Sequence, residues 1–423
     1  MNPKSLLISR KNPTHARFLL TILLLSLSLA SPSQARGNSF ADDPTKPITE
    51  TEMVRIAMAR PAVSGLIKGQ LALAESDLTA ARLWPNPELQ YARETVDRIH
   101  GDDTEDTFWI SQQFEISGAR GLRKDAARMR VDGAHFTARA DRLAMEADAR
   151  RLFHRLLYQH RLVLAGEDWE ERISNIAAVV EKRERAGDVS GYDSLRLSRE
   201  RASVNAAVGK EKATRSRLWA AMSALLGGPD VASRYDGVTG ALLPEPPPVL
   251  TDLLAALAER PDIAQLEREV AALDLERRAG SRGWVPELTL GAGQKRMDDD
   301  LGNDTGPMIA AGITLPLFNR GQADEQRASA QAEIARNRLQ LLVQQAQGEV
   351  SGLWREVAGL RSAALEAQRG ASEEALRMIR IAEAAYEGGE LGVLELLDAY
   401  RSAHLAEIQA LELSVAARLA SIQ

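Results

Sequence analysis

The chain of 423 residues contains no cysteine. This absence excludes disulfide bonds, thiolate metal sites, a thiol nucleophile and lipid attachment through a cysteine. Aromatic residues are also scarce, at 4% of the chain, whereas the hydrophobic fraction is 44%. Small and aliphatic residues therefore dominate, as in long packed helices. The formal net charge of −6 is mild for this length, so we expect no nucleic acid partner.

The sequence also lacks the patterns of an enzyme or of a resident metal site. His154 and His160 are six residues apart, which misses the spacing of three or four that brings two side chains to one helix face. The acidic stretch at 298–304 lacks the glycine-to-glutamate spacing of an EF-hand and is typical of a solvated loop. No phosphate-binding loop or nucleophile elbow occurs in the sequence. We therefore expect no catalytic residue, no cofactor and no metal site.

Long apolar runs are absent beyond the amino-terminal region. Residues 18–30 (FLLTILLLSLSLA) form the one such run, and basic residues precede it, from Lys4 to Arg17. Ser33 and Ala35 provide the small side chains that signal peptidase requires. The sequence thus predicts a signal peptide over 1–35, followed by a linker over 36–48. An amino-terminal anchor is the alternative, although about 13 residues fall short of the roughly 20 that span a bilayer.

The remaining chain repeats one plan, with a period of about 200 residues. The first copy is predicted over 49–227 and the second over 250–423, and a proline-rich linker at 228–249 joins them. Matching positions are Arg60-Pro61 and Arg260-Pro261, Trp84 and Trp284, Arg120-Gly121 and Arg320-Gly321, and Gly187 and Gly389. Each copy is predicted to contain a helix, two short strands, a very long helix, a glycine turn and a returning helix.

Two segments favour exceptionally long helices. Residues 122–185 contain no proline and only two glycines, and residues 322–387 contain no proline. About 60 residues at about 1.5 Å each give a rod on the order of 90 Å, which is typical of coiled coils or helical barrels. The alternative is a series of shorter helices, with breaks at glycines. In the second segment these glycines are Gly348, Gly352, Gly359 and Gly370.

Alternating segments predict four strands, at 88–95, 107–116, 287–294 and 308–317. The second and fourth are ten residues long, and about 9 to 11 residues suffice for a tilted strand to cross the hydrocarbon layer. Trp109 and Gln112 interrupt the alternation in the second strand. Acidic loops are expected at 97–106 and 295–306. The predicted lipid-facing residues are Phe108, Ile110, Phe114, Ile309, Ile313 and Leu315.

Four strands cannot close a barrel, because an open edge in lipid leaves backbone groups without partners. If the strands enter a membrane, the chain must be an oligomer, and three chains would supply about 12 strands, above the minimum of about eight. Two or four chains remain possible by arithmetic. A soluble pair of hairpins that caps a coiled coil is an alternative of another kind.

Three motifs together resemble the TolC-type outer membrane efflux proteins: PNPEL at 85–89, LPLFNRG at 315–321 and AGDVSGYD at 186–193. The segment FEISGARGLR at 114–123 is similar to the strand-to-helix junction of the CzcC-like heavy-metal efflux branch. The resemblance implies a mainly α fold with a small β part, built from a duplicated helix-hairpin-long helix unit. It implies a homotrimer whose twelve-stranded outer-membrane β-barrel continues into a periplasmic α-helical barrel, in the outer membrane of a Gram-negative cell.

The resemblance also implies a passive exit duct in a tripartite efflux system, which conducts heavy-metal cations to the exterior. The implied partners are a periplasmic adaptor (membrane fusion protein), an inner-membrane pump of the proton-driven resistance-nodulation-division type, and outer membrane lipid. Drug efflux and type I secretion are alternatives within this class. A periplasmic coiled-coil structural protein is the alternative of another class.

The two glycine turns are the implied docking sites for the adaptor. Gly187 and Gly389 end long helices, where a left-handed residue satisfies the last carbonyl groups. Ser190 or Asp193 is placed to cap the returning helix of the first copy. Plain helix corners without a partner are the alternative. The expected docking residues are Gly187, Asp188, Val189, Ser190, Gly388, Gly389, Glu390, Leu391 and Gly392.

Overall fold

The computed structural model describes residues 46–98, 101–299 and 302–422. All of them belong to one unit, Pro44–Gln423. The predicted signal peptide, 1–35, and most of the predicted linker, 36–48, lie outside the described residues. Within the described residues, none of the helices combines the length and the apolar character that a bilayer span requires.

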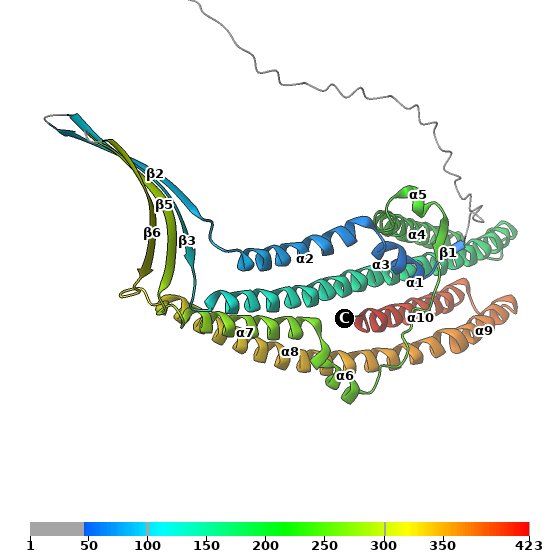
Figure 1. The fold of residues 1–423 in the computed structure, drawn as a ribbon. Helices are drawn as coiled ribbons and strands as arrows, with labels where there is room; N and C mark the ends of the chain where they lie inside the picture. The colour runs from blue at the N-terminus through cyan, green and yellow to red at the C-terminus, as the bar shows by residue number, and fades with distance from the viewer. Residues whose placement is uncertain (1–45, 99–100, 300–301, 423) are drawn as a thin grey trace, which may run out of the picture. The chain divides into compact units, whose positions relative to one another are not determined.

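Two copies of one structural plan follow each other along this unit (Figure 1). The first comprises α2 (Pro61–Arg82), β2 (Glu88–Arg98), β3 (Gly101–Phe114), α3 (Ala119–Ala186) and α4 (Gly191–Leu226). The second comprises α7 (Pro261–Gly280), β5 (Glu287–Asp299), β6 (Gly302–Thr314), α8 (Gln322–Arg369), a π-helix (Gly370–Glu374), α9 (Ala375–Glu387) and α10 (Val393–Ala420). The smaller elements are β1 (Lys46–Ile48), α1 (Glu50–Met58), α5 (Pro229–Ala232), β4 (Tyr235–Val238), α6 (Leu250–Ala256) and a 3-10 helix (Leu257–Glu259).

Equivalent prolines begin the first helix of each copy. Pro61 and Pro261 occupy the first turn of α2 and α7, where a missing N–H costs no intrahelical hydrogen bond. Arg60 and Arg260 precede them in extended conformations, which the proline ring favours for its neighbour. These local requirements explain why this part of the repeat is visible in the sequence.

The long helices form as the sequence predicts. α3 is one helix of 68 residues, which at about 1.5 Å per residue extends about 100 Å. The second rod runs from α8 to α9 and contains a π-helical turn that begins at Gly370. Gly348, Gly352 and Gly359 stay inside α8, so only one of the four glycines coincides with a change of helix type. A π-turn adds a residue to one turn and thereby rotates the face that later residues present, without breaking the rod.

The four hairpin strands form one antiparallel sheet in the order β2-β3-β5-β6. The strands extend further towards the hairpin tips than predicted, so the loops expected at 97–106 and 295–306 are mostly strand. Ladder hydrogen bonds do not require apolar side chains, and cross-strand charge pairs stabilise the polar ends of the strands. One such pair joins Arg93 and Asp106 at 2.6 Å.

The strands also end earlier at the helical side than predicted. β3 stops at Phe114 and β6 at Thr314, whereas the alternating pattern continues to 116 and 317. Pro316 lacks the N–H that a ladder requires. The apolar residues beyond these ends therefore belong to the connections between sheet and helices.

The helices beside the sheet repeat the order of the strands. α2 packs on α3, α3 on α7, and α7 on α8, so the helical layer has the order α2-α3-α7-α8. Figure 1 shows these helices leaving the same end of the sheet. One edge of the combined layer is formed by β2 and α2 and the other by β6 and α8. Among the described residues, these edge elements have a neighbour within their layer on one side only.

Two large groups of buried residues hold the helices together, and two smaller groups join α3 to α7 and α7 to α8. The first, which we call the tip core, joins α3, α4, α9 and α10 and includes Trp169, Ile173, Leu197, Ile379, Tyr386, Leu397 and Tyr400. The second, the middle core, includes Met53, Phe153, Leu157 and Met222. The linkers predicted at 36–48 and 228–249 contribute to the middle core, because β1 and β4 pair in parallel and bury Ile48 and Val238. In their described parts these segments are packed structure and not free linkers.

Candidate functional site

The strand register divides the sheet into two chemically different faces. Residues opposite each other in an antiparallel pair share a face, and neighbours along a strand alternate. One face, which we call the apolar face, carries Leu89, Tyr91, Phe108, Ile110, Phe114, Leu288, Leu290, Ile309 and Ile313. The other, the polar face, carries Glu88, Gln90, Glu94, Glu105, Thr107, Ser111, Gln113, Glu287, Thr289, Lys295 and Thr314, with Trp109 and Met308 among them.

Five of the six residues predicted to face lipid share the apolar face: Phe108, Ile110, Phe114, Ile309 and Ile313. Leu315 follows the last residue of β6 and lies outside the ladder. Ile309 is 88% exposed and Ile110 is 50% exposed. A contiguous exposed aliphatic surface of this kind marks contact with lipid or with another protein. Contact with lipid stays a prediction.

Aromatic and charged residues bound the apolar face at both ends. Towards the hairpin tips, the Tyr91 hydroxyl donates to Oδ1 of Asp106 at 2.8 Å. Arg93 donates twice to the same carboxylate, at 2.7 and 2.6 Å. At the helical end, Trp84 meets Phe114 in a T-shaped contact with ring centroids 6.1 Å apart. Tyrosine and tryptophan favour membrane-water interfaces, so this arrangement fits an apolar band between two aromatic boundaries.

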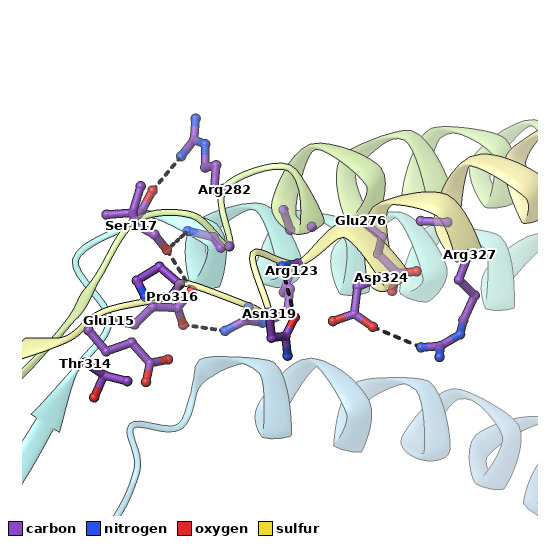
Figure 2. A pocket seen from close by; sticks show the side chains of 18 of the residues that line it. Glu115, Ser117, Arg123, Glu276, Arg282, Thr314, Pro316, Asn319, Asp324 and Arg327 are labelled. Atoms are coloured by element: carbon purple, nitrogen blue, oxygen red, sulfur yellow. Dashed lines mark hydrogen bonds and ion pairs between the residues drawn. The ribbon is translucent and has the colours of Figure 1, made fainter.

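A cavity of about 760 Å³ lies where the sheet meets the helices, lined by residues of both repeats (Figure 2). Arg282, between α7 and β5, donates to the carbonyl oxygen of Ser117 at 3.2 Å. Arg123 forms an ion pair with Glu115. Because these charged groups bind neighbouring protein groups, we assign the junction a role in fixing the turns between strands and helices.

The junction corrects the predicted alignment of the two repeats. Gly118 and Gly321 are the N-cap residues of α3 and α8, and both are left-handed, with φ of 71° and 80°. Gly121, which the sequence paired with Gly321, lies inside α3. The left-handed backbone requires glycine at Gly118, and a Cβ atom there would also displace the guanidinium of Arg282, whose Nη1 would stand 2.7 Å away. The Arg-Gly dipeptide at 120–121 is identical to the one at 320–321, and this identity led the sequence alignment away from Gly118, the structural equivalent of Gly321.

The two glycine turns have the expected backbone geometry. Gly187 ends α3 with φ of 85°, and Gly389 follows α9 with φ of 75°. The N–H of Asp188 donates to the carbonyl oxygen of Arg183 at 2.8 Å, which closes the last turn of α3. Ser190 caps α4 through its side chain. The predicted left-handed ends and the serine cap are thus confirmed.

The side chains of the turns differ in their exposure. Val189 and Leu391 are half-buried and pack against the tip core. The exposed members are Gly187, Asp188, Ser190, Gly388, Gly389, Glu390 and Gly392. The two apolar residues therefore anchor the turns. Backbone groups and polar side chains remain for a partner.

The two turns lie together at the end of the helices that is far from the sheet (Figure 1). The guanidinium of Arg183, on α3, lies 4.8 Å from the ring centroid of Tyr386, on α9. Arg401 of α10 pairs with Glu200 of α4 at 2.7 Å. A single partner can therefore contact both turns.

Beside the second turn lies a groove that the sequence did not reveal. Its volume is about 470 Å³, and its lining includes Glu374, Met378, Ile381, Leu391, Glu395 and Asp398. Ile381 is 60% exposed and Met378 is 39% exposed. The groove thus combines exposed apolar side chains with three acidic ones and with one basic one, Arg377. The three-residue spacing of Met378 and Ile381 on α9 is the signal that could have found it.

Titratable groups surround another cavity, of about 600 Å³, between α3, the π-helix and α10. His404 stacks on Trp169 with ring centroids 5.8 Å apart, and Asp168 pairs with Arg172 at 2.7 Å. Burial lowers the pKa of His404 and raises the pKa of Glu407. In the part of the chain that the structure describes, no three His, Cys, Asp or Glu side chains are grouped to hold a metal ion. The cluster can therefore respond to pH, which no sequence motif indicated.

Comparisons with known proteins agree with this geometry. Residues 253–423 match the family model described as outer membrane efflux protein. The chain is 26% identical over 409 residues to the cobalt-zinc-cadmium resistance protein CzcC of Cupriavidus metallidurans, covering 92% of this chain and 93% of that protein. It is 26% identical over 283 residues to the nickel-cobalt-cadmium resistance protein NccC of Alcaligenes xylosoxydans xylosoxydans, covering 63% of this chain and 62% of that protein. The fold is similar to the Campylobacter jejuni CmeC outer membrane channel, with a TM-score of 0.72, 15% identity, and coverage of 91% of this chain and 88% of that chain.

The sheet with its two faces, the matching helical layer and these similarities define a TolC-type channel fold. The chain resembles the outer membrane efflux proteins, through the family model that matches residues 253–423 and through its similarity to CzcC. Its location is therefore the outer membrane of a Gram-negative cell, with the helices extending into the periplasm. The predicted mainly α fold with a small β part, the resemblance to this family and the predicted location are confirmed.

Proposed function

We propose that this protein is the outer-membrane exit duct of a tripartite efflux system and that it passively conducts heavy-metal cations to the exterior. The observation that carries the proposal is the shared order of strands and helices, β2-β3-β5-β6 and α2-α3-α7-α8. A layer that keeps its order from sheet to helices can close around one axis into one continuous duct. The apolar face then meets lipid, and the polar face lines the lumen.

Three copies supply the closure. Strand edges in a membrane require partners, so β2 of one copy pairs with β6 of the next, and three four-stranded sheets make one twelve-stranded barrel. The edge helices support the same arrangement. α2 has no buried residue, and its Leu66 and Leu73 are 50% and 68% exposed. On α8, at the other edge, Ile334 and Leu341 are 51% and 56% exposed, so apolar surfaces meet when the ring closes.

Metal cations are the substrate class that the polar face and the relatives favour. The acidic residues of the polar face include Glu88, Glu94, Glu105 and Glu287, and its basic residues include Lys295. An acidic lumen raises the local concentration of cations. The names of CzcC and NccC refer to resistance to cobalt, zinc, cadmium and nickel. The cation is cargo here, so the duct requires no resident metal site, cofactor or catalytic residue.

The adaptor docks at the two glycine turns, and the inner-membrane pump, of the proton-driven resistance-nodulation-division type, supplies the energy. The exposed backbone and polar groups of both turns form the contact surface, with Val189 and Leu391 holding the turns against the tip core. The groove beside Met378 and Ile381 adds an exposed apolar patch next to the second turn. A helical partner that carries apolar and basic side chains fits this surface.

The test is complementation in a Gram-negative strain that retains a metal-efflux pump and adaptor but lacks the duct. We expect the protein to restore growth in Co²⁺, to remain with outer membranes after a salt wash, and to scatter light as a trimer in detergent. A folded monomer in detergent contradicts the duct. Release by salt supports the alternative of a periplasmic coiled-coil scaffold.

The substrate class is tested in the same strain with two further panels. Restored tolerance to organic drugs, without tolerance to Co²⁺, Zn²⁺ or Cd²⁺, contradicts metal efflux and supports the drug-efflux alternative. Restored export of a protein substrate from a type I system supports the secretion alternative. Tolerance to the metals alone supports the proposal.

A further inference from the structure

Trp109 lies on the polar face of the sheet, across two glycines of the neighbouring strand. β3 pairs with β5 so that Trp109 is opposite Gly293, and Gly291 is the next residue of β5 on the same face. A Cβ atom added at Gly291 would stand 2.6 Å from Cε2 of the Trp109 ring, and one added at Gly293 would stand 2.9 Å from Cε3. The indole ring therefore occupies the space that a side chain at Gly291 would fill, and it shares the space at Gly293 with the carbonyl oxygen of Phe108.

Backbone conformation does not explain these glycines. Neither Gly291 nor Gly293 is among the residues with positive φ, so other residues could adopt the same backbone. Glycine inside a strand weakens it and marks close approach of another group. At Gly291 the group that approaches is the ring of Trp109, and at Gly293 the carbonyl oxygen of Phe108 approaches together with that ring.

Gly312 shows that the close approach is specific. It lies on the same polar face, in β6, where it pairs with Thr289. A Cβ atom added there would meet only Cβ of Thr289, at 4.0 Å. A glycine on the polar face therefore does not always have a large side chain packed over it.

We propose that Trp109 determines the inner diameter (the bore) of the duct within the membrane, and that Gly291 and Gly293 allow its ring to lie against the barrel wall. This inference rests on the proposed function, because the polar face lines a lumen only in the closed barrel. Three copies bring three indole rings to one height. Twelve strands about 4.8 Å apart, tilted by about 40°, close into a cylinder of roughly 12 Å radius. A ring lifted from the wall narrows that passage, and a ring seated on the glycines leaves it open to hydrated cations.

The absence of cysteine from the chain allows a direct test. Thr314→Cys places one thiol on the polar face at the helical end of β6, whereas the hairpin tips lie at the opposite end of the strands. A charged thiosulfonate reagent added outside intact cells passes the level of Trp109 before it reaches position 314. The rate of modification therefore reports the bore inside the sheet and does not depend on the glycine turns at the far end of the helices.

We expect Gly291→Ala to displace the ring and to slow modification at position 314. Trp109→Ala should speed it. When both substitutions are combined, the rate should equal that of Trp109→Ala alone, because no ring remains to be displaced. Gly312→Ala is the matched control, with the same change on the same face, and should leave the rate unaltered. A bulky reagent should show larger differences than a small one.

Equal rates in all of these trimers overturn the proposal and leave Trp109 as a packing residue. If Gly291→Ala prevents trimer formation, the Trp109→Ala variant alone tests the proposal. Removing a ring that does not restrict the passage would leave the rate of modification unchanged. A different outcome is that the trimer carrying only Thr314→Cys is not modified at all. This result would show that the polar face does not line a lumen. That outcome removes the proposed function and is distinct from equal, measurable rates.

Discussion

Ala310 and Ala311 are neighbours in β6 but belong to opposite faces of the sheet. Ala310 pairs with Gly291 on the polar face, and Ala311 pairs with Leu290 on the apolar face. Both alanines are exposed in the single chain. One step along the strand therefore separates the proposed lumen from the proposed lipid contact, whatever number of copies closes the barrel.

Single cysteines at these two positions should differ in reactivity. In intact outer membranes, Ala310→Cys should react with a charged, water-soluble thiol reagent, and Ala311→Cys should not. Hydrocarbon excludes both the charged reagent and the thiolate that attacks it. The gel shift of a heavy thiol label measures the difference. Both variants should react fully in denaturant, and reaction of both in the native membrane would show that the apolar face is not in lipid.

A charge introduced at adjacent positions of β3 should also separate the two faces. Ile110→Arg places a guanidinium on the apolar face and should cost about 2 to 4 kcal/mol near the bilayer midplane. Ser111→Arg places the same group on the polar face, where water is available, and should insert normally. The amount of trimer recovered from outer membranes is the measurement. Similar losses for both variants would mean that the assigned register is wrong.

Features that depend on a few neighbouring residues could be predicted from the sequence. Pro61 and Pro261 begin helices, and Gly187 and Gly389 end them, because the backbone chemistry involved is local. The apolar alternation of Phe108 and Ile110 likewise placed both on one face. Duplication of the plan strengthened each of these predictions, since the same local signal occurred twice.

Features that depend on strand pairing could not be predicted in this way. Trp109 appeared as an interruption of the alternating pattern, because its seat, Gly291 and Gly293, belongs to the other repeat. The strand ends near the hairpin tips were missed because polar residues continued the ladder beyond the apolar pattern.

His404 should make the helical part of the protein sensitive to mild acid. Burial lowers the pKa of His404 from its usual 6.5, against an opposing effect of Asp168. The unfolded chain then binds the proton more readily, so stability falls as the pH drops through 6.5 towards the lowered pKa. Glu407 contributes the opposite slope, because burial raises its pKa from 4.5 and the folded form holds the proton more tightly.

We therefore expect His404→Phe, which keeps an aromatic ring beside Trp169, to lose less thermal stability than the native chain between about pH 7.5 and about pH 5.5. The melting temperatures of the two proteins are compared by circular dichroism at about 222 nm, the helical band, during heating of the detergent-solubilised trimers. Glu407 is retained in both proteins, so its slope cancels in the difference. A parallel loss of stability in the two proteins would contradict the role of His404.

The glycine turns provide the most direct test of function. Gly187→Val and Gly389→Val force a β-branched residue into a left-handed conformation, with φ of 85° and 75°, at a cost of about 1 to 2 kcal/mol or more. Gly209→Val is the control, because Gly209 lies inside α4 and, as at both turns, an added Cβ meets nothing within 4 Å. The two turn variants should lose adaptor crosslinking and Co²⁺ resistance. The sheet lies at the other end of helices about 100 Å long, so trimer yield and outer-membrane location should stay unchanged. The double variant should be no worse than the stronger single one if both turns serve one docking event, and full resistance with normal crosslinking in both would identify them as plain helix corners.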